Sequence, residues 1–515
     1  MAEKTFFNSG GESPDPERRP SQAQTPSSRW ASIFGGPGVT VGPRIAGLPD
    51  FVKRDVSDSE DSSSVILNKQ LAAEEGEQIQ YRTCSWQKTA ALLFSEYICL
   101  AIMSFPWSYS VLGLVPGLIL TAVVAATVLY TSLVLWEFCL RHPEVRDVCD
   151  IGQMLFWGKE WAWWGTAFCF ILNNTFIQGL HVLVGAKYLN TMTEADDVGS
   201  CRTVMFSVIV TVICLFASLP RTFDMMAKLG TASALFTFIS VVLAAVFVGI
   251  QSHPAGYDFA TLGDPIVTAI PVKGTTFVNG MSAFLNISYT FIGQITLPSF
   301  IAEMRDPRDF PKSLWACTIA EIIVFSIVGA VMYAYTGNQY MTAPAFGSLE
   351  PVYKKVAFSF MIPTIIFLGC LYASVSARFV FFRVFRNSKH MNSHTVVGWA
   401  SWTGILASTW VLAFIIALVI PFFNSLLSVM SSLFDCWFGF IFWGVAYFRM
   451  RGADQKIGRH HSAVTDWTAN IINIMLIGIG VLFLTVGTYA SVQGIIDSFE
   501  AGQVAGAFSC ATNGI

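Results

Sequence analysis

The stretch NISYTFIGQ, residues 286–294, places asparagine, serine, tyrosine, threonine, glycine and glutamine inside an otherwise apolar segment. FVNGMSAFL precedes this stretch and ITLPSFIAEM follows it. Polar groups without hydrogen-bond partners are costly in the hydrocarbon of a bilayer. If the segment crosses a membrane, its polar centre therefore indicates a functional site.

The composition is typical of a membrane protein. The chain has 515 residues, of which 53% are hydrophobic and 13% are charged, whereas soluble proteins carry about 25% charged residues. We therefore expect a lipid bilayer to surround most of the chain. The eleven cysteines form no CxxC pair and no Cys/His ligand spacing, so no metal site is expected, and no nucleic-acid partner is expected either.

Three regions differ in composition. Residues 1–85 are rich in Ser, Pro, Gly, Asp and Glu, which predicts a disordered cytosolic tail. Within this tail, DVSDSEDSSS (55–64) is either a solvated acidic run or a phosphorylation cluster, and cytosolic regulators are candidate partners of the tail. Residues 86–495 form the predicted transmembrane domain, and residues 496–515 form a predicted extracellular tail.

The transmembrane domain contains eleven apolar runs of about 20 residues, each long enough to cross a bilayer as a helix. The sequence therefore predicts an all-α polytopic membrane protein. The predicted spans are 88–111, 114–139, 161–190, 203–219, 228–250, 275–302, 312–336, 356–384, 396–420, 422–447 and 468–493.

Lys and Arg concentrate in alternate loops, for example RVFRNSKH and RMRGADQKIGRHH. The positive-inside rule places these loops and the N-terminus in the cytosol, and an odd number of spans places the C-terminus outside. Among the cysteines, only Cys201 and Cys510 then face the oxidising side, where they either pair in a disulfide or remain free thiols.

The first span repeats the pattern of the sixth. In YICLAIMSFPWSYSVLG (97–113), Pro106 removes a backbone hydrogen-bond donor and several serines lie close to it, which predicts a break at residues 101–104. The sixth span has its polar centre, then Gly293 and Pro298. For either span alone, a simple proline kink is the alternative interpretation.

The two interrupted spans are five positions apart, so a duplicated five-span unit would insert in the opposite orientation. Paired broken helices in two inverted halves are typical of the midplane site of a secondary transporter. Half-helix N-termini suit a carboxylate, and freed carbonyl groups suit an ammonium group. The pattern therefore favours an amino acid as the ligand.

AIMSFPWSYSVLG (101–113) and GQITLPSFIAEMRDPRDFPKSL (293–314) resemble the amino acid/auxin permease family, in particular fungal neutral amino acid permeases of the N-system type. The resemblance implies a leucine-transporter-type fold, with inverted repeats at about 86–250 and 275–447 and an extra helix at 468–493. It also implies import of neutral L-amino acids, aliphatic and aromatic, by proton symport at the plasma membrane. Gln294 stands where many relatives carry a histidine, so a proton mechanism based on that imidazole would not apply.

The resemblance also implies a set of substrate-binding residues. The substrate carboxylate is expected on the backbone of Ala101, Ile102, Met103 and Ser104. The ammonium group and the side chain are expected at Ile287, Ser288, Tyr289 and Ile292. In the third span, Asn174, Gln178 and His181 share one helical face, where they either contact substrate or form interhelical hydrogen bonds.

Candidate coupling and gating residues are ionisable or hydroxylated side chains. Asp435 and Glu96 are the leading proton-relay candidates, because charged residues inside spans are commonly functional, although a structural salt bridge is the alternative. Ser374 and Ser376 occupy the region that helps to hold the ion in sodium-coupled relatives of the fold. The gate candidates, whose charge pairs would close the inner mouth or only cap a loop, are Glu303, Arg305 and Lys312.

Other functions remain open at this point. No acid occurs among the predicted substrate-binding residues of the first, sixth and eighth spans, which favours neutral substrates. A transporter-like sensor that signals through the tail and a sodium-coupled transporter are the alternatives, and the vacuolar membrane is the alternative location. The sequence has no HExxH, GxSxG or phosphate-loop motif, so we expect neither an enzyme nor a cofactor other than the coupling proton.

Overall fold

The structure, a computed structural model, describes residues 31–36, 38–46, 84–145, 147–193, 201–221, 223–385, 388, 390, 394–458, 463–502 and 506–515. Regular structure in this part of the chain is helical, with a single isolated bridge between Cys84 and Met304. The acidic run at 55–64 lies outside the described residues.

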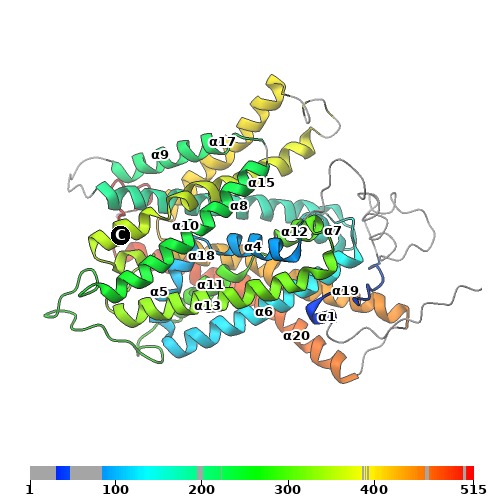
Figure 1. The fold of residues 1–515 in the computed structure, drawn as a ribbon, viewed down its shortest axis with the longest axis horizontal. Coiled ribbons are helices and arrows are strands. Elements are labelled where there is room, and N and C mark those ends of the chain that lie inside the picture. The colour runs from blue at the N-terminus through cyan, green and yellow to red at the C-terminus, as the bar shows by residue number, and fades with distance from the viewer. Residues whose placement is uncertain are drawn as a thin grey trace, which may run out of the picture.

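Long helices run side by side along the longest axis of the molecule (Figure 1). The first half contains α4 (Trp86–Tyr97), η1 (Leu100–Ser104), α5 (Phe105–Leu112), α6 (Leu114–Arg141), α7 (Val148–Leu155), α8 (Glu160–Thr193), α9 (Arg202–Ala217) and α10 (Phe223–Ile250). The second half contains α11 (Phe277–Phe291), α12 (Leu297–Glu303), α13 (Phe310–Thr336), α14 (Pro351–Ser359), α15 (Ile362–Val384), α17 (Val396–Val419), α18 (Phe423–Met430), η4 (Ser431–Ile441) and α19 (Phe442–Lys456). The chain continues through α20 (Ala463–Leu482), η5 (Phe483–Gly487) and α21 (Thr488–Glu500).

The all-α prediction is confirmed, and each of the eleven predicted spans coincides with one helix or with consecutive helices. Among the described residues, eight helices are long and apolar enough to cross a membrane, or nine when the bent pair Trp86–Tyr97 and Leu100–Leu112 counts as one span. The helix Arg202–Ala217 has only 16 residues. The exact number of eleven therefore stays a prediction.

Contacts between helices agree with two five-span units. Helices at equivalent positions of the two halves pack against each other: α5 against α11, α6 against α13, α8 against α15, and α9 against α17. A pseudo-two-fold axis in the membrane plane, as in inverted-repeat transporters, would bring equivalent helices together in this way. The inverted repeat itself stays a prediction.

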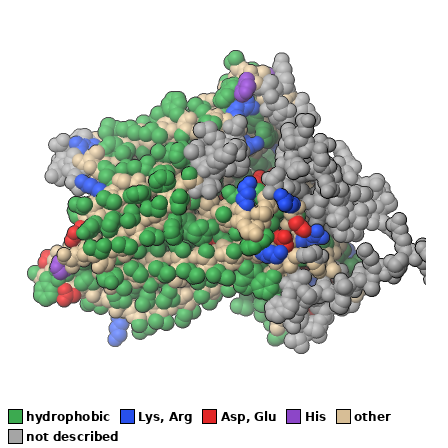
Figure 2. Space-filling view, in the orientation of Figure 1, with side chains coloured by type: hydrophobic (Ala, Val, Ile, Leu, Met, Phe, Trp, Pro, Cys, Tyr) green, Lys and Arg blue, Asp and Glu red, His purple; other side chains and the backbone are tan. Residues whose placement is uncertain are grey.

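Apolar side chains cover the middle of the face seen in Figure 2, whereas charged side chains gather mostly toward its two ends. Exposed apolar side chains recur at helical spacing on α13, at Ile319, Ile323 and Ile327. Large exposed apolar surfaces on a folded protein mark an interaction with another apolar phase. This surface fits the hydrocarbon of a bilayer.

The C-terminal segment 506–515 is fastened to the ends of α8 and α9. A disulfide joins Cys201 to Cys510. The Lys187 ammonium donates to the Asn513 carbonyl oxygen (3.0 Å), and the Thr203 hydroxyl donates to the Ala511 carbonyl oxygen (2.6 Å). The segment is therefore held by both covalent and polar contacts.

Part of the predicted disordered tail has a defined place. Helix α1 (Ala31–Phe34) and residues 38–46 pack on the helices at the end of the molecule opposite the C-terminus (Figure 1). The tail as a whole is polar, but it contains a short apolar stretch that its average composition does not reveal. In this stretch Ile45 is buried and Val39 and Val41 pack against the core. For these residues the structure differs from the expectation of disorder.

Gly113 is the single residue that joins α5 to α6, and its conformation leads to a testable prediction. Its backbone (φ 80°, ψ 157°) suits glycine almost exclusively, and an added Cβ would lie 2.5 Å from the Ile270 carbonyl carbon. We expect Gly113→Ala to lower the free energy of unfolding by about 1–3 kcal/mol, measured as thermal unfolding of the purified protein in detergent. Gly404→Ala is the control, because Gly404 has open space around it. Equal unfolding temperatures for both variants would contradict the prediction.

Candidate functional site

The first span is broken two residues before the position that the sequence predicts. Helix α4 ends at Tyr97, Cys99 is extended (φ −121°, ψ −175°), and residues 100–104 form the 3₁₀ turn η1. Pro106 lies in the first turn of α5, where its missing N–H would have had no partner. The proline therefore starts a helix, and the break lies upstream of the turn that holds residues 101–104.

The sixth span is broken just after its polar centre. Helix α11 ends at Phe291, Ile292 is extended (φ −91°, ψ 105°), and α12 begins at Leu297 with Pro298 in its first turn. Ile287 and Ser288 are therefore helical and buried.

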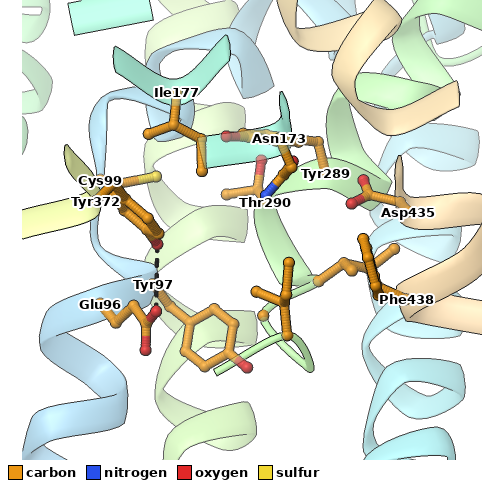
Figure 3. A pocket seen from close by; sticks show the side chains of 13 residues that line it. Glu96, Tyr97, Cys99, Asn173, Ile177, Tyr289, Thr290, Tyr372, Asp435 and Phe438 are labelled. Carbon is orange, nitrogen blue, oxygen red and sulfur yellow. Dashed lines mark hydrogen bonds between the residues drawn. The ribbon is translucent and has the colours of Figure 1, made fainter. Parts of the chain in front are cut away.

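The two breaks touch each other. A Cβ added at Gly293 would lie 2.5 Å from the ring atom Cε1 of Tyr97, so only glycine lets the two segments approach this closely. The Glu96 side chain extends the contact: the Thr296 hydroxyl donates to Glu96 Oε2 (3.1 Å) and the Tyr372 hydroxyl donates to Glu96 Oε1 (3.2 Å; Figure 3). Glu96 thus connects the first break, the second break and α15.

A cavity of about 50 Å³ lies beside this contact. It has room for a few water molecules, whereas pockets that hold small-molecule ligands have volumes of about 300–1,000 Å³. A ligand as large as an amino acid therefore requires the walls to move. The lining residues are Glu96, Tyr97, Cys99, Asn173, Ile177, Tyr289, Thr290, Ile292, Gly293, Ile295, Tyr372, Asp435 and Phe438.

Asp435 lies on the opposite wall from Glu96 (Figure 3). It belongs to the π-helical segment η4, a conformation that is frequent at functional sites. The residue is only 5% exposed, and its Oδ2 atom has no hydrogen-bond partner in the described part of the chain. The two acids therefore differ, because both oxygens of Glu96 are occupied and one oxygen of Asp435 is not.

Four of the predicted site residues line this cavity, namely Glu96, Tyr289, Ile292 and Asp435. Residues 101–104 are buried in η1 next to the first break, and they do not line the cavity. The two acids also change the argument for neutral substrates, because the predicted substrate-binding residues contained no acid, whereas the cavity wall contains the carboxyl groups of Glu96 and Asp435.

The polar face of α8 is directed at α15 instead. The Asn174 amide donates to the Ser376 hydroxyl (3.0 Å), and a ring nitrogen of His181 lies 3.0 Å from the Ile365 carbonyl oxygen. Gln178 donates to the Asn174 carbonyl oxygen (3.2 Å), and the Ser374 hydroxyl is buried. None of the residues Asn174, Gln178, Ser374 and Ser376 lines the cavity, and their predicted roles stay predictions.

Several lining residues were not predicted. Asn173 and Ile177 each precede by one position a predicted residue of α8, and one residue is more than a quarter of a helical turn. The sequence pattern identified the polar stretch but not which side of the helix faces the cavity. Gln294 does not line the cavity, and its amide donates to the Thr131 hydroxyl (2.9 Å).

The loop with the predicted gate residues is stabilised by local ion pairs. Lys312 pairs with Asp309 (2.6 Å) and Arg308 pairs with Asp306 (2.8 Å). Although burial opposes it, hydrogen bonding from Arg308 holds the pKa of Asp306 below its usual range. The Cys84 N–H donates to the Glu303 carbonyl oxygen (3.1 Å), and the Arg305 N–H donates to the Cys84 carbonyl oxygen (2.9 Å). Here the backbone ties the start of the first span to the end of the sixth.

Among the described residues, no three His, Cys, Asp or Glu side chains gather so that they could hold a metal ion.

Comparisons with known proteins agree on one family. The profile of the family described as transmembrane amino acid transporter protein matches residues 82–493. The N amino acid transport system protein of Neurospora crassa is 30% identical over 446 residues, which cover 87% of this chain and 92% of that protein. A transmembrane transporter of Gibberella moniliformis is 29% identical over 474 residues, which cover 89% of this chain and 93% of that protein.

Among solved structures, the crystal structure of MhsT in complex with L-phenylalanine matches 80% of this chain and 99% of that chain, with 12% identity and a TM-score of 0.47.

The contact between the two breaks predicts a specific pair of substitutions. Gly293→Ala should lower the free energy of unfolding by about 1–3 kcal/mol, because the added methyl group overlaps the Tyr97 ring. Gly293→Ala should cost less stability when it is introduced into Tyr97→Leu than when it is introduced into the wild type, because the smaller side chain leaves room for the methyl group. Thermal unfolding of the two single variants and the double variant measures this difference. Gly280→Ala in α11, upstream of the break, is the control, since a Cβ at Gly280 meets open space. Strictly additive effects of Gly293→Ala and Tyr97→Leu would show that the ring and the glycine are not coupled.

Proposed function

This chain belongs to the family of transmembrane amino acid transporter proteins, and we propose that it imports neutral L-amino acids, aliphatic and aromatic, by proton symport. The observation that carries the proposal is the cavity between the two helix breaks, with an unpartnered carboxyl oxygen of Asp435 in its wall. The name of the Neurospora relative, an N amino acid transport system protein, supports amino acids as substrates.

The helix breaks supply the groups that a zwitterion needs. The first N–H groups of a helix have no acceptor inside it, and the turn η1 followed by α5 starts beside the cavity. The last carbonyl groups of α11, next to Tyr289 and Ile292, carry a negative partial charge, whereas the free N–H groups carry a positive one. We assign the substrate carboxylate to the N–H groups at the start of η1 and α5, and the substrate ammonium to the last carbonyl groups of α11. Ile177, Ile292 and Phe438 give the cavity apolar walls for a neutral side chain.

Asp435 is the better of the two candidates for carrying the proton. A charged carboxylate at mid-membrane costs about 3 kcal/mol or more unless it is neutralised, and Asp435 Oδ2 has no donor in the described structure. Glu96 instead holds Thr296 and Tyr372. A proton on Asp435 makes the wall neutral, which suits a substrate without a side-chain charge.

Alternating access follows from the size of the cavity. A cavity of about 50 Å³ is too small to hold an amino acid, so the walls of the site have to move apart before the substrate binds. Transport then requires the two halves to move apart first on one face and then on the other. We place the transporter in the plasma membrane, in line with the resemblance to fungal uptake permeases.

The function is tested by uptake into sodium-free liposomes. We expect labelled leucine and phenylalanine to accumulate when the proton gradient is directed inward, and we expect a protonophore to abolish the accumulation. Uptake that requires sodium would move the coupling site to Ser374 and Ser376. Binding without uptake would favour a sensor, and strong saturable arginine uptake would overturn the neutral specificity.

The role of Asp435 is tested by Asp435→Asn. This variant should lose accumulation against a gradient and keep exchange of labelled for unlabelled substrate, because the amide preserves shape and cannot carry the proton. The matched control is Glu321→Gln, since Glu321 is a second buried acid (3% exposed) that does not line the cavity. Proton-driven accumulation that persists in Asp435→Asn would exclude Asp435 as the coupling group.

A further inference from the structure

We propose that a line of polar side chains between α11 and α18 conducts the proton from the outer face to Asp435. The inference rests on the proposed transport function for the role of Asp435, and it adds the path by which the proton arrives. The ligand of this path is water. The side chains, here called the polar line, are Ser282, Asn286, Thr290, Asn424, Ser428 and Ser431.

One half of the polar line belongs to α18 and the start of η4. Its residues recur at spacings of four, three and four positions and lead to the acid: Asn424, Ser428, Ser431 and Asp435. Such spacings keep the first three residues on one side of an α-helix. Ser428 and Ser431 are fully buried, whereas Asn424 is half-buried in the first turn of α18. Under the predicted topology α18 begins at the outer face, so the series leads inward to the cavity.

The other half of the polar line belongs to α11 and faces the first. Ser282, Asn286 and Thr290 follow each other at intervals of four residues, so they share one side of their helix. The Ser428 hydroxyl lies 3.0 Å from Asn286 Oδ1 and 3.4 Å from the Ser282 carbonyl oxygen. The Thr290 hydroxyl donates to the Asn286 carbonyl oxygen (2.9 Å). Thr290 and Asp435 both line the cavity (Figure 3), so the two halves meet there.

Four buried atoms along this path have no hydrogen-bond partner in the described part of the chain. They are Asn424 Oδ1, Asn286 Nδ2, Ser431 Oγ and Asp435 Oδ2. A polar atom left without a partner inside a membrane protein is costly, and buried water molecules usually bind to such atoms. Water bound along the polar line would satisfy all four atoms and would connect the outer face to Asp435.

The spacing of the polar line suits single water molecules. Side chains three or four residues apart on a helix are separated by about 5–6 Å, and one water with a hydrogen bond on each side spans about 5.5 Å. A proton from bulk water enters at Asn424. Each water molecule or serine hydroxyl then accepts one proton and releases another toward the cavity. The last one releases its proton to the Asp435 carboxylate, which becomes a neutral acid, while the Asn286 amide only orients the water.

The lining of the cavity explains why a proton has to be brought to Asp435. Within the described lining no Lys, Arg or His is present to neutralise this carboxylate. The second acid, Glu96, lies on the opposite wall and accepts hydrogen bonds from Thr296 and Tyr372. The titratable groups that share the cavity with Asp435 are Glu96, Tyr97, Cys99, Tyr289 and Tyr372.

Arrival of the proton can be measured without substrate and without transport. We would record infrared spectra of the full-length protein in liposomes at acidic pH and identify the protonated carboxyl group of Asp435 as the band that Asp435→Asn lacks. After transfer to heavy water, the shift of this band gives the rate at which the carboxyl group exchanges its proton for deuterium. Ser431→Val removes one hydrogen-bonding position from the polar line and should slow the exchange roughly fivefold, which is about 1 kcal/mol in the barrier.

Matched variants separate the loss of the hydroxyl from a change of shape. Ser431→Thr has nearly the volume of Ser431→Val and keeps the hydroxyl, so it should restore the exchange rate. Ser432→Val alters the next serine, which is also buried but donates to the Val429 carbonyl oxygen (3.1 Å), and should leave the rate unchanged. Asn286→Leu tests the facing helix and should slow the exchange.

The outcomes distinguish this inference from the transport proposal. Equal exchange rates in Ser431→Val and Ser431→Thr would overturn the path, and so would unchanged exchange in Asn286→Leu or an equally slow exchange in Ser432→Val. The absence of any carboxyl band that depends on Asp435 would overturn both the path and the coupling role of this residue. A chain that shows no uptake in liposomes but the expected exchange pattern would overturn only the proposed function.

Discussion

The contact between two broken helices is the constraint on which the rest of the structure depends. A helix that stops inside a bilayer leaves backbone groups that only protein or enclosed water can satisfy. The two breaks solve this together, with Tyr97 against Gly293 and with Glu96 bound to Thr296 and Tyr372. Because these polar ends must face one another, the apolar sides of the surrounding helices are left to face lipid.

The sequence predicted that the two helix breaks and the two cavity acids exist, but not the exact positions of all the residues involved. Polar residues and prolines in the first and sixth spans indicated two breaks, and the intramembrane acids Glu96 and Asp435 both line the cavity. The exact break positions were missed because a proline in the first turn of a helix and a proline that interrupts a helix look alike in sequence. Asn173 was missed in favour of its neighbour, because the polar residues of α8 serve both the cavity and the contact with α15.

Two acids in one small cavity carry different physical roles. Glu96 accepts hydrogen bonds from two hydroxyl groups on separate segments, so it holds those segments in position. Asp435 has an oxygen without a donor in the described chain. In our proposal it acts by gaining and losing a proton. A residue type that is expensive in a membrane is thus used once to fix the architecture and once, in our proposal, to change with the transport cycle.

The disulfide between Cys201 and Cys510 has a consequence for how the molecule is made. Its cysteines are 309 positions apart, so the bond closes a covalent ring that contains the helices from α9 to α21. A disulfide forms only between thiols in the same compartment, so under the predicted topology this ring closes only after the last predicted span has been inserted. Under that topology, the bond distinguishes a chain whose predicted spans have all been inserted from a chain inserted with one span too few, whose two thiols would lie in different compartments.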